Sequence, residues 1–121
     1  MHLVPITQTK SLADYAEVIG DERYEELRAL AKAAAGHSML HVNATAYGGG
    51  VAEILQNLVP LLRDAGVDAR WAVLDAPAAF YDITKKIHNA LQGMKLDLSE
   101  DEKRLFLRSA ARTPRSSNAR T

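Results

Sequence analysis

Three consecutive glycines, Gly48, Gly49 and Gly50, stand between a short apolar run and a long amphipathic run. Glycine loses more backbone freedom on folding than any other residue, so three in succession need a reason. A glycine-rich turn between a strand and a helix is a common anion site, because the helix N-terminus presents free amide groups and the positive end of its dipole. The pattern therefore indicates a turn that a ligand approaches. The alternative is a tight turn with close helix–strand packing and no ligand.

Two common nucleotide-binding motifs do not fit these glycines. A P-loop requires G-x-x-x-x-G-K-[ST], and the glycines are not followed by that Lys and Ser or Thr. The dinucleotide fingerprint G-x-G-x-x-G fails because its third glycine would fall at Glu53. The motif alone leaves a sugar, a phosphate or a nucleotide as the ligand.

Polar residues cluster just before the glycines. His41, Asn43, Thr45 and Tyr47 lie where a predicted strand ends, and the carboxyl ends of parallel strands are where α/β proteins bind ligands. His41 could hydrogen-bond a ligand, or it could be a core histidine bonded to backbone. Asn43 and Thr45 could instead stabilise the turn, since Asn and Thr readily bond their own backbone.

A second polar group, His88, Asn89 and Gln92, falls on one predicted helix, with His88 and Gln92 four residues apart on one face. The alternative to a binding role is a solvated helix surface. His37 and His41 are also four apart, but on a strand that spacing separates them by about 13 Å. We therefore expect no metal site, and neither a catalytic pair of acids nor a Ser–His–Asp arrangement is indicated.

The hydrophobic pattern predicts the elements that position these residues. Residues 11–19 and 21–35 have helical spacing, and each segment is followed by a glycine. Residues 38–42 are typical of a strand buried on both faces, and residues 68–74 alternate as a second strand. The order from residue 37 is strand, glycine-rich turn, helix, strand, helix, which predicts an α/β fold with a βαβ unit.

Three helices are predicted in the second part of the chain, beginning near Val51, Pro77 and Ser99. Pro60 should kink the first of them. Ser99 and Glu102 form a capping box that opens the last. The stripe of the first helix that is predicted to be buried comprises Ile54, Leu55, Leu58, Leu62 and Ala65.

Composition narrows the function classes. The 121 residues carry 15 basic and 15 acidic side chains and no cysteine, which excludes a disulfide framework. Residues 1–107 hold 11 Lys and Arg against 15 Asp and Glu, so this part offers no basic field to nucleic acid. The apolar stretches are too short for a membrane span. We expect a soluble, cytoplasmic protein that binds neither nucleic acid nor membrane.

A longer block of residues resembles a known family. The sequence HVNATAYGGGVAEILQNLVPLLRDAGVDARWAVL, followed by FYDITKKIHNALQG, is similar to the N-terminal part of trehalose synthases of the glycosyltransferring type. These are retaining nucleotide-sugar glycosyltransferases with the GT-B fold. The similarity covers about Leu12 to Leu107. The blocks GGGVAEIL, DARW and HNALQG are specific in combination, whereas GGG alone is not.

The resemblance implies two Rossmann-like domains facing each other across a cleft. The N-terminal domain would hold the acceptor sugar, with His41, Asn43, Tyr47, His88, Asn89 and Gln92 as candidate contacts. Gly48, Gly49 and Gly50 would approach the donor diphosphate. The reaction would move glucose from UDP-glucose or ADP-glucose to glucose, with the nucleotide sugar as a substrate and no cofactor. The alternatives are a trehalose phosphorylase-like activity and a stand-alone sugar- or nucleotide-binding module.

The same resemblance divides the chain into three parts. Residues 1–36 are an N-terminal helical segment, residues 37–107 a partial Rossmann-like acceptor-side domain, and residues 108–121 a basic tail expected to be disordered. The tail departs from the family pattern, which indicates a truncated or frameshifted product; the alternative is a flexible surface tail. We expect the chain to be inactive alone and to associate, for example as a homo-oligomer, through uncovered strand edges and helix faces.

Overall fold

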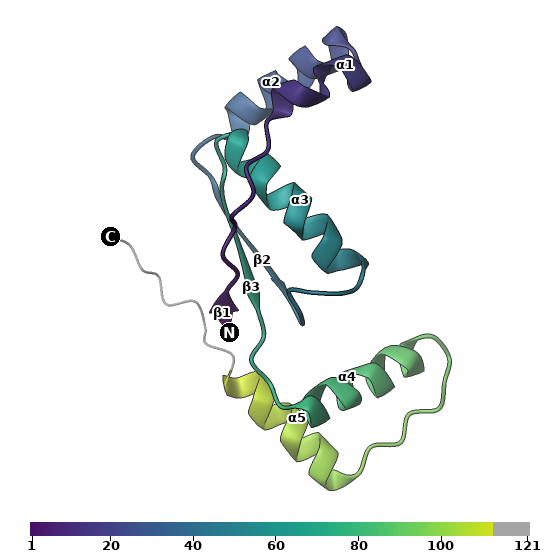
Figure 1. The fold of residues 1–121 in the computed structure, drawn as a ribbon. Helices are drawn as coiled ribbons and strands as arrows, with labels where there is room; N and C mark the ends of the chain where they lie inside the picture. The colour runs from purple at the N-terminus through teal and green to yellow at the C-terminus, as the bar shows by residue number, and fades with distance from the viewer. Residues whose placement is uncertain (113–121) are drawn as a thin grey trace. The chain divides into compact units, whose positions relative to one another are not determined.

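The computed structural model describes residues 1–112, which form two compact units (Figure 1). Residues 2–74 make the first unit, and the residues from Asp75 on, with Met1, make the second. The elements of the first are β1 (His2–Leu3), a 3₁₀ helix (Leu12–Tyr15), α1 (Ala16–Ile19), α2 (Asp21–Ala34), β2 (Ser38–Asn43), α3 (Gly50–Asp64) and β3 (Asp68–Val73). The second contains α4 (Ala78–Leu91) and α5 (Glu100–Arg112).

The predicted βαβ unit is confirmed. Strands β2 and β3 pair in parallel, with Ser38 opposite Asp68 and Asn43 opposite Val73, and α3 connects them. The chain is therefore a mixed α/β protein whose sheet is compatible with a partial Rossmann-like unit. The short strand β1 was not predicted; it pairs antiparallel with the other edge of β3, so the strand order is β1-β3-β2.

The core of the first unit lies between α3 and β3. Ala52, Leu55 and Val59 of α3 pack against buried residues of β3, among them Trp71. The predicted helical stripe is partly wrong, because Ile54 is 62% exposed and Leu58 is 37% exposed. Helix α3 packs mainly on β3, with less contact to β2, so its buried side is turned toward positions 52, 55 and 59.

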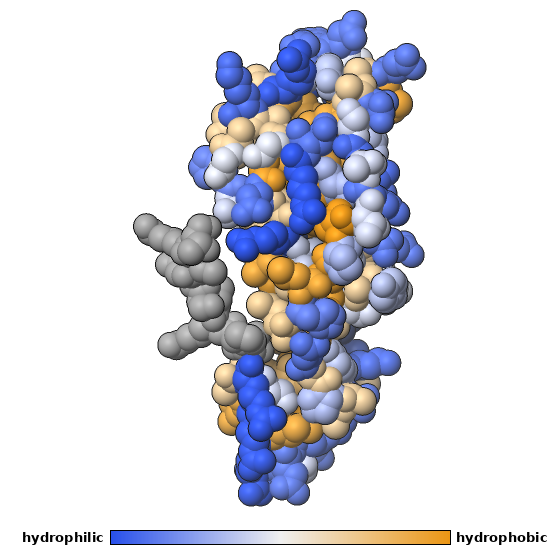
Figure 2. Space-filling model, turned by 60° about the vertical axis from the view of Figure 1, so that its left-hand side comes forward, coloured by the Kyte–Doolittle hydropathy of each residue, from blue (hydrophilic) through white to orange (hydrophobic). Residues whose placement is uncertain are grey.

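Strand β2 lies at one edge of the sheet and is more exposed than expected. Met39, Leu40 and Val42 all remain exposed, so the prediction of a strand buried on both faces is wrong for the part of the chain that the structure describes. Figure 2 shows hydrophobic side chains at the surface among polar ones. The sequence carries the composition of an interior strand, but within residues 1–112 only β3 pairs with it.

Helices α4 and α5 pack through aromatic rings and one ion pair. The rings of Phe80 and Phe106 stack with centroids 5.6 Å apart. The Lys86 ammonium donates to a Glu102 carboxylate oxygen at 2.5 Å. No helix among the described residues is both long and apolar enough to cross a bilayer.

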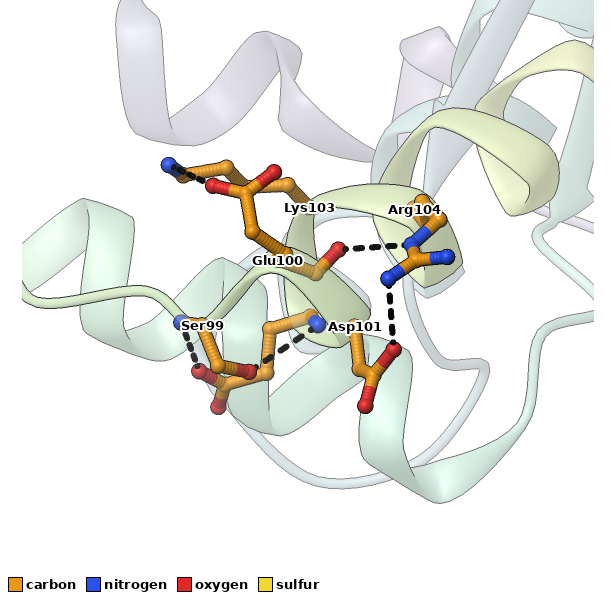
Figure 3. Close-up of polar contacts among 6 residues, drawn as sticks. Ser99, Glu100, Asp101, Lys103 and Arg104 are labelled. Atoms are coloured by element: carbon orange, nitrogen blue, oxygen red, sulfur yellow. Dashed lines mark hydrogen bonds and ion pairs between the residues drawn. The ribbon is translucent and has the colours of Figure 1, made fainter.

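The predicted capping box opens α5 (Figure 3). The amide of Ser99 donates to the Glu102 carboxylate at 2.9 Å, and the amide of Glu102 donates to the Ser99 hydroxyl at 3.2 Å. Helix α5 continues to Arg112, so residues 108–112 of the expected disordered tail are helical. Ala110 and Ala111 favour this continuation, because alanine has the highest helix propensity. Residues 113–121 lie outside the described part.

Two leucines on one helix give a matched test of this packing. Leu55→Ala removes a side chain that is only 6% exposed and leaves a cavity, so we expect it to lower the free energy of unfolding by about 2 to 4 kcal/mol. Leu58→Ala removes a more exposed side chain and should cost less than about 1 kcal/mol. Urea unfolding of both variants measures the difference, and equal losses would contradict the placement of α3.

The α4–α5 ion pair predicts a pH dependence. The hydrogen bond from Lys86, and then the one from the Ser99 amide, hold the pKa of Glu102 below its usual value; the same bond to Glu102 raises the pKa of Lys86. The stabilising effect of Glu102 is therefore complete above its unfolded pKa of about 4.3 and is lost as pH falls through the lower folded pKa. The stabilising effect of Lys86 is complete below its unfolded pKa of about 10.4 and is lost as pH rises through the higher folded pKa.

Glu102→Gln tests this dependence, because glutamine keeps the capping box and removes only the charge. We expect the wild-type protein to exceed the variant in α5 stability at pH 7, and the difference to shrink toward pH 3. Amide hydrogen exchange in α5 provides the measurement. Glu100→Gln removes a carboxylate that pairs within α5 and serves as the control. A difference that stays constant or grows at pH 3 would count against the ion pair.

Candidate functional site

The loop between β2 and α3 is held by its own polar side chains. The Asn43 amide nitrogen donates to the Thr45 carbonyl at 2.8 Å. The Thr45 hydroxyl donates to the Tyr47 carbonyl at 2.8 Å and lies 3.1 Å from the Tyr47 amide nitrogen, which donates to it. These contacts match the turn-stabilising alternative for Asn43 and Thr45.

Asn43 also connects the two parallel strands. Its amide oxygen accepts a hydrogen bond from the indole Nε1 of Trp71 at 2.7 Å. Both ends of the Asn43 side chain are therefore bonded within the protein, which gives it a structural role at the end of the strand.

The three glycines differ in what the backbone requires of them. Gly48 has φ +72° and Gly49 has φ +87° with ψ 150°, a conformation adopted almost only by glycine. Gly50 has no such conformation. Apart from the adjoining residues and the backbone of the same helix, a Cβ atom added at any of the three would meet no atom within 4 Å. Crowding by neighbouring elements therefore does not explain why these three positions are glycine. The backbone conformation explains Gly48 and Gly49, but it does not explain Gly50.

Gly49 and Gly50 stand where α3 begins. The first amide groups of an α-helix have no partner inside the helix, and the dipole makes this end positive. Glu53 is the acidic residue of the first turn, and its amide donates to the Gly49 carbonyl at 3.3 Å. The loop thus offers backbone donors in open space at the C-terminal end of a parallel strand.

His41 is half-buried on the edge strand β2, in register with Trp71 on the neighbouring strand. Its Nε2 atom is buried and makes no hydrogen bond with any residue of the described chain. The backbone hydrogen bond of the core-histidine alternative is therefore not seen at this nitrogen. Most buried polar atoms have a partner, so the unpaired nitrogen is an exception in this unit.

A cavity of about 220 Å³ opens beside the loop. Tyr47 lines it and is 82% exposed. The other walls come from residues 4–8, Ala46, Gln56 of α3 and Trp71 of β3. Sequence analysis missed Thr7, Gln8 and Gln56, because no local pattern shows that the N-terminal segment crosses next to α3.

The other three predicted acceptor-sugar contacts belong to the second unit. His88, Asn89 and Gln92 lie on or next to α4 in the second unit, where the His88 Nε2 and the Gln92 amide nitrogen are 3.1 Å apart. His37 Nδ1 lies 3.1 Å from the Ala34 carbonyl oxygen. Within residues 1–112 no three His, Cys, Asp or Glu side chains are grouped so that they could hold a metal ion.

Comparisons with known proteins agree with the sequence resemblance. A family model described as "Trehalose synthase, N-terminal domain" matches residues 41–120. Trehalose synthases of Thermococcus litoralis and Pyrococcus furiosus are each 54% identical over 99 residues, which is 81% of this chain and 24% of each relative. That of Rubrobacter xylanophilus is 47% identical over 97 residues, 80% of this chain and 23% of the relative. The chain thus spans about a quarter of the length of these relatives, and it belongs to the family of trehalose synthase N-terminal domains.

Proposed function

We propose that the chain is the N-terminal part of a glycosyltransferase that moves glucose from a nucleotide-glucose donor to glucose, with retention, to give trehalose. The proposal is supported by the match to the trehalose synthase N-terminal domain and by the named trehalose synthases that are 47 to 54% identical to it. The proposed donor is UDP-glucose or ADP-glucose, and it acts as a substrate.

The observation that carries this function is the open glycine loop at the start of α3. Transfer of glucose leaves negative charge on the departing diphosphate. Backbone donors and a helix N-terminus stabilise such a charge when they are already oriented toward it. An added Cβ at Gly48, Gly49 or Gly50 would enter empty space rather than protein, so a phosphate or a sugar can reach the backbone there.

Gly50 gives the most direct support for a ligand. In the first turn of a helix, glycine is less stable than alanine by roughly 0.5–1 kcal/mol. Neither its φ angle nor a close neighbour in the described chain explains this choice. The close approach of a substrate does explain it, because a methyl group at this position would occupy the space that the substrate needs.

The chain supplies only part of such a site. No Lys or Arg occurs between Lys32 and Arg63, a stretch that contains β2, the loop and most of α3. A nucleotide diphosphate carries more charge than a helix dipole of about half a unit can balance. We therefore assign the cationic groups that bind the donor to a second domain, and we expect the chain alone to be inactive.

A chimera tests the proposed reaction. Residues 1–107 replace the corresponding N-terminal part of the Thermococcus litoralis relative, and the product is measured with UDP-glucose or ADP-glucose and glucose. We expect the chimera to form α,α-trehalose, identified by its anomeric NMR signals, and the 121-residue chain alone to form none. The unmodified relative is the control. A folded chimera without activity, or trehalose made by the short chain alone, would contradict the proposal.

Two glycine variants separate the fold from the site. Gly49→Ala places a side chain in a conformation reserved for glycine, so it should lower the free energy of unfolding by about 1–3 kcal/mol. Gly50→Ala should leave stability unchanged or raise it by up to about 1 kcal/mol, yet reduce trehalose formation by the chimera at least tenfold. Urea unfolding of the chain and the transferase assay of the chimera provide both measurements. Full activity of Gly50→Ala would show that no substrate approaches this residue.

A further inference from the structure

The sheet edge formed by β1 is short and protected. Strand β1 has two residues, and Pro5, two positions after its end, has no amide group to donate to another strand. The Ala69 carbonyl, two residues before that of Trp71 and on the same side of β3, accepts a hydrogen bond from the Arg63 Nε at 2.7 Å. This edge therefore offers little free backbone for pairing.

The opposite edge of the sheet, formed by β2, is open. The carbonyls of His37 and Asn43 accept hydrogen bonds from amides at either end of β3, at 2.9 and 3.0 Å. Backbone groups of successive strand residues point to opposite sides, so the amides and carbonyls of Ser38, Leu40 and Val42 point away from β3. Within residues 1–112 no second strand pairs with this side of β2.

The sequence of β2 does not prevent pairing with another strand. Its residues, SMLHVN, include no Lys, Arg, Asp, Glu, Pro or Gly. Edge strands of natural proteins usually carry a charged residue, a proline or a bulge that stops other strands from adding to the sheet. The side chains of Met39, Leu40 and Val42 are apolar and exposed. The β2 edge thus combines free backbone groups with an apolar surface, the combination that favours addition of a strand.

Helix α3 adds an apolar flank on the β2 side of the unit. Gln56 faces residues 4–8, which continue from β1, because both line the same cavity. Ile54 and Leu58 are each two positions from Gln56, or about 200° around the helix, so they project from the opposite flank. A groove of about 520 Å³ follows this flank, and Leu61 lines it together with Ile54 and Leu58. The exposed helix flank and the open strand edge therefore lie on the same side of the first unit.

We propose that the β2 edge and this flank of α3, together called the β2 surface, form the interface of a homodimer in which β2 pairs antiparallel with β2 of a second copy. A two-fold axis perpendicular to the sheet places Leu40 opposite Leu40 of the second copy, and Ser38 opposite Val42 of the second copy. The outward amide and carbonyl groups of each pair then exchange hydrogen bonds. The same axis places both copies of α3 on one face of the joined sheet, with the flanks that carry Ile54 and Leu58 toward each other.

A second copy suits this surface in charge and in area. Because β2 has no acidic residue, lysine or arginine, self-pairing places no such like charges opposite each other. The exposed fractions of the six apolar side chains on the surface add up to about three whole residues; these are Met39, Leu40, Val42, Val51, Ile54 and Leu58. At about 1.45 Å² per dalton this is roughly 480 Å² per copy, or about 1,000 Å² for two. Specific interfaces begin at about 1,000 Å², so we expect a Kd in the micromolar range.

Sedimentation velocity of the complete 121-residue chain tests the dimer. We expect the average mass to rise from 13.2 kDa toward twice this value as the concentration increases from about 1 to 500 µM, and to stop there because two-fold pairing closes. A monomer at every concentration, or growth beyond the dimer, would overturn the proposal. The experiment contains neither sugar nor donor. A monomeric chain would therefore leave the proposed reaction standing, and an inactive chimera would leave the dimer standing.

Two lysine variants on opposite edges connect the dimer to the β2 surface. Leu40→Lys places two ammonium groups opposite each other at the axis, so we expect the dimer to be weakened at least tenfold. Leu3→Lys changes an exposed leucine of β1 and should dimerise like the wild type. Far-UV circular dichroism checks that both variants are folded. Unchanged dimerisation of Leu40→Lys, or equal weakening by both variants, would contradict the proposed pairing.

A single cysteine tests the register without disrupting the dimer. The chain has no cysteine, so Leu40→Cys introduces its one thiol. Opposite residues of a hydrogen-bonded antiparallel pair have Cα atoms about 5.5 Å apart, and a disulfide spans about 4.4–6.8 Å. We expect mild oxidation to link most of the Leu40→Cys chains into covalent dimers on a non-reducing gel, and few of the Leu3→Cys chains at the same concentration. Equal cross-linking of the two variants would overturn the proposed interface.

Discussion

The side chain and backbone of Trp71 link more parts of the first unit than any other residue described above. The ring is buried between β3 and α3, and its Nε1 donates to Asn43 at the end of β2. Its carbonyl accepts a hydrogen bond from the Val4 amide, which fixes the N-terminal segment against β3. The position of the β2–α3 loop depends on this residue, because Asn43 bonds Trp71 with one end of its amide and Thr45 with the other. Stability and site geometry therefore share one set of contacts.

Local sequence signals predicted the order of the elements. Glycines mark the ends of segments, periodicity separates helices from strands, and Ser99 with Glu102 specifies the start of α5. These signals act over a few residues, and the structure confirms them. The parallel pairing of β2 with β3 followed from the same pattern, since a strand–helix–strand order of this length favours a parallel connection.

Features that depend on distant contacts were not predicted. The period of α3 allows more than one buried side, and packing on β3 rather than midway between the strands decides that Val59 is buried and Ile54 is exposed. The strand β1 has only two residues and carries no pattern of its own. The cavity wall formed by residues 4–8 and the contact between Lys86 and Glu102 also join segments that no short-range rule connects. For the candidate site, sequence identified the loop, but it did not separate Asn43, which is bonded inside the protein, from Tyr47, which is exposed.

The absence of Lys and Arg between Lys32 and Arg63 has a kinetic consequence. A helix dipole acts on a charge only within about one turn of the helix end. Full charges instead act over a Debye length of about 8 Å and accelerate the arrival of an oppositely charged ligand. The glycine loop can therefore stabilise an anion that is already in contact with it, but it does not attract one from solution. An anionic ligand of this loop would be captured first by other groups and would meet the loop afterwards, so added salt would slow the capture far more than it would weaken the final contact.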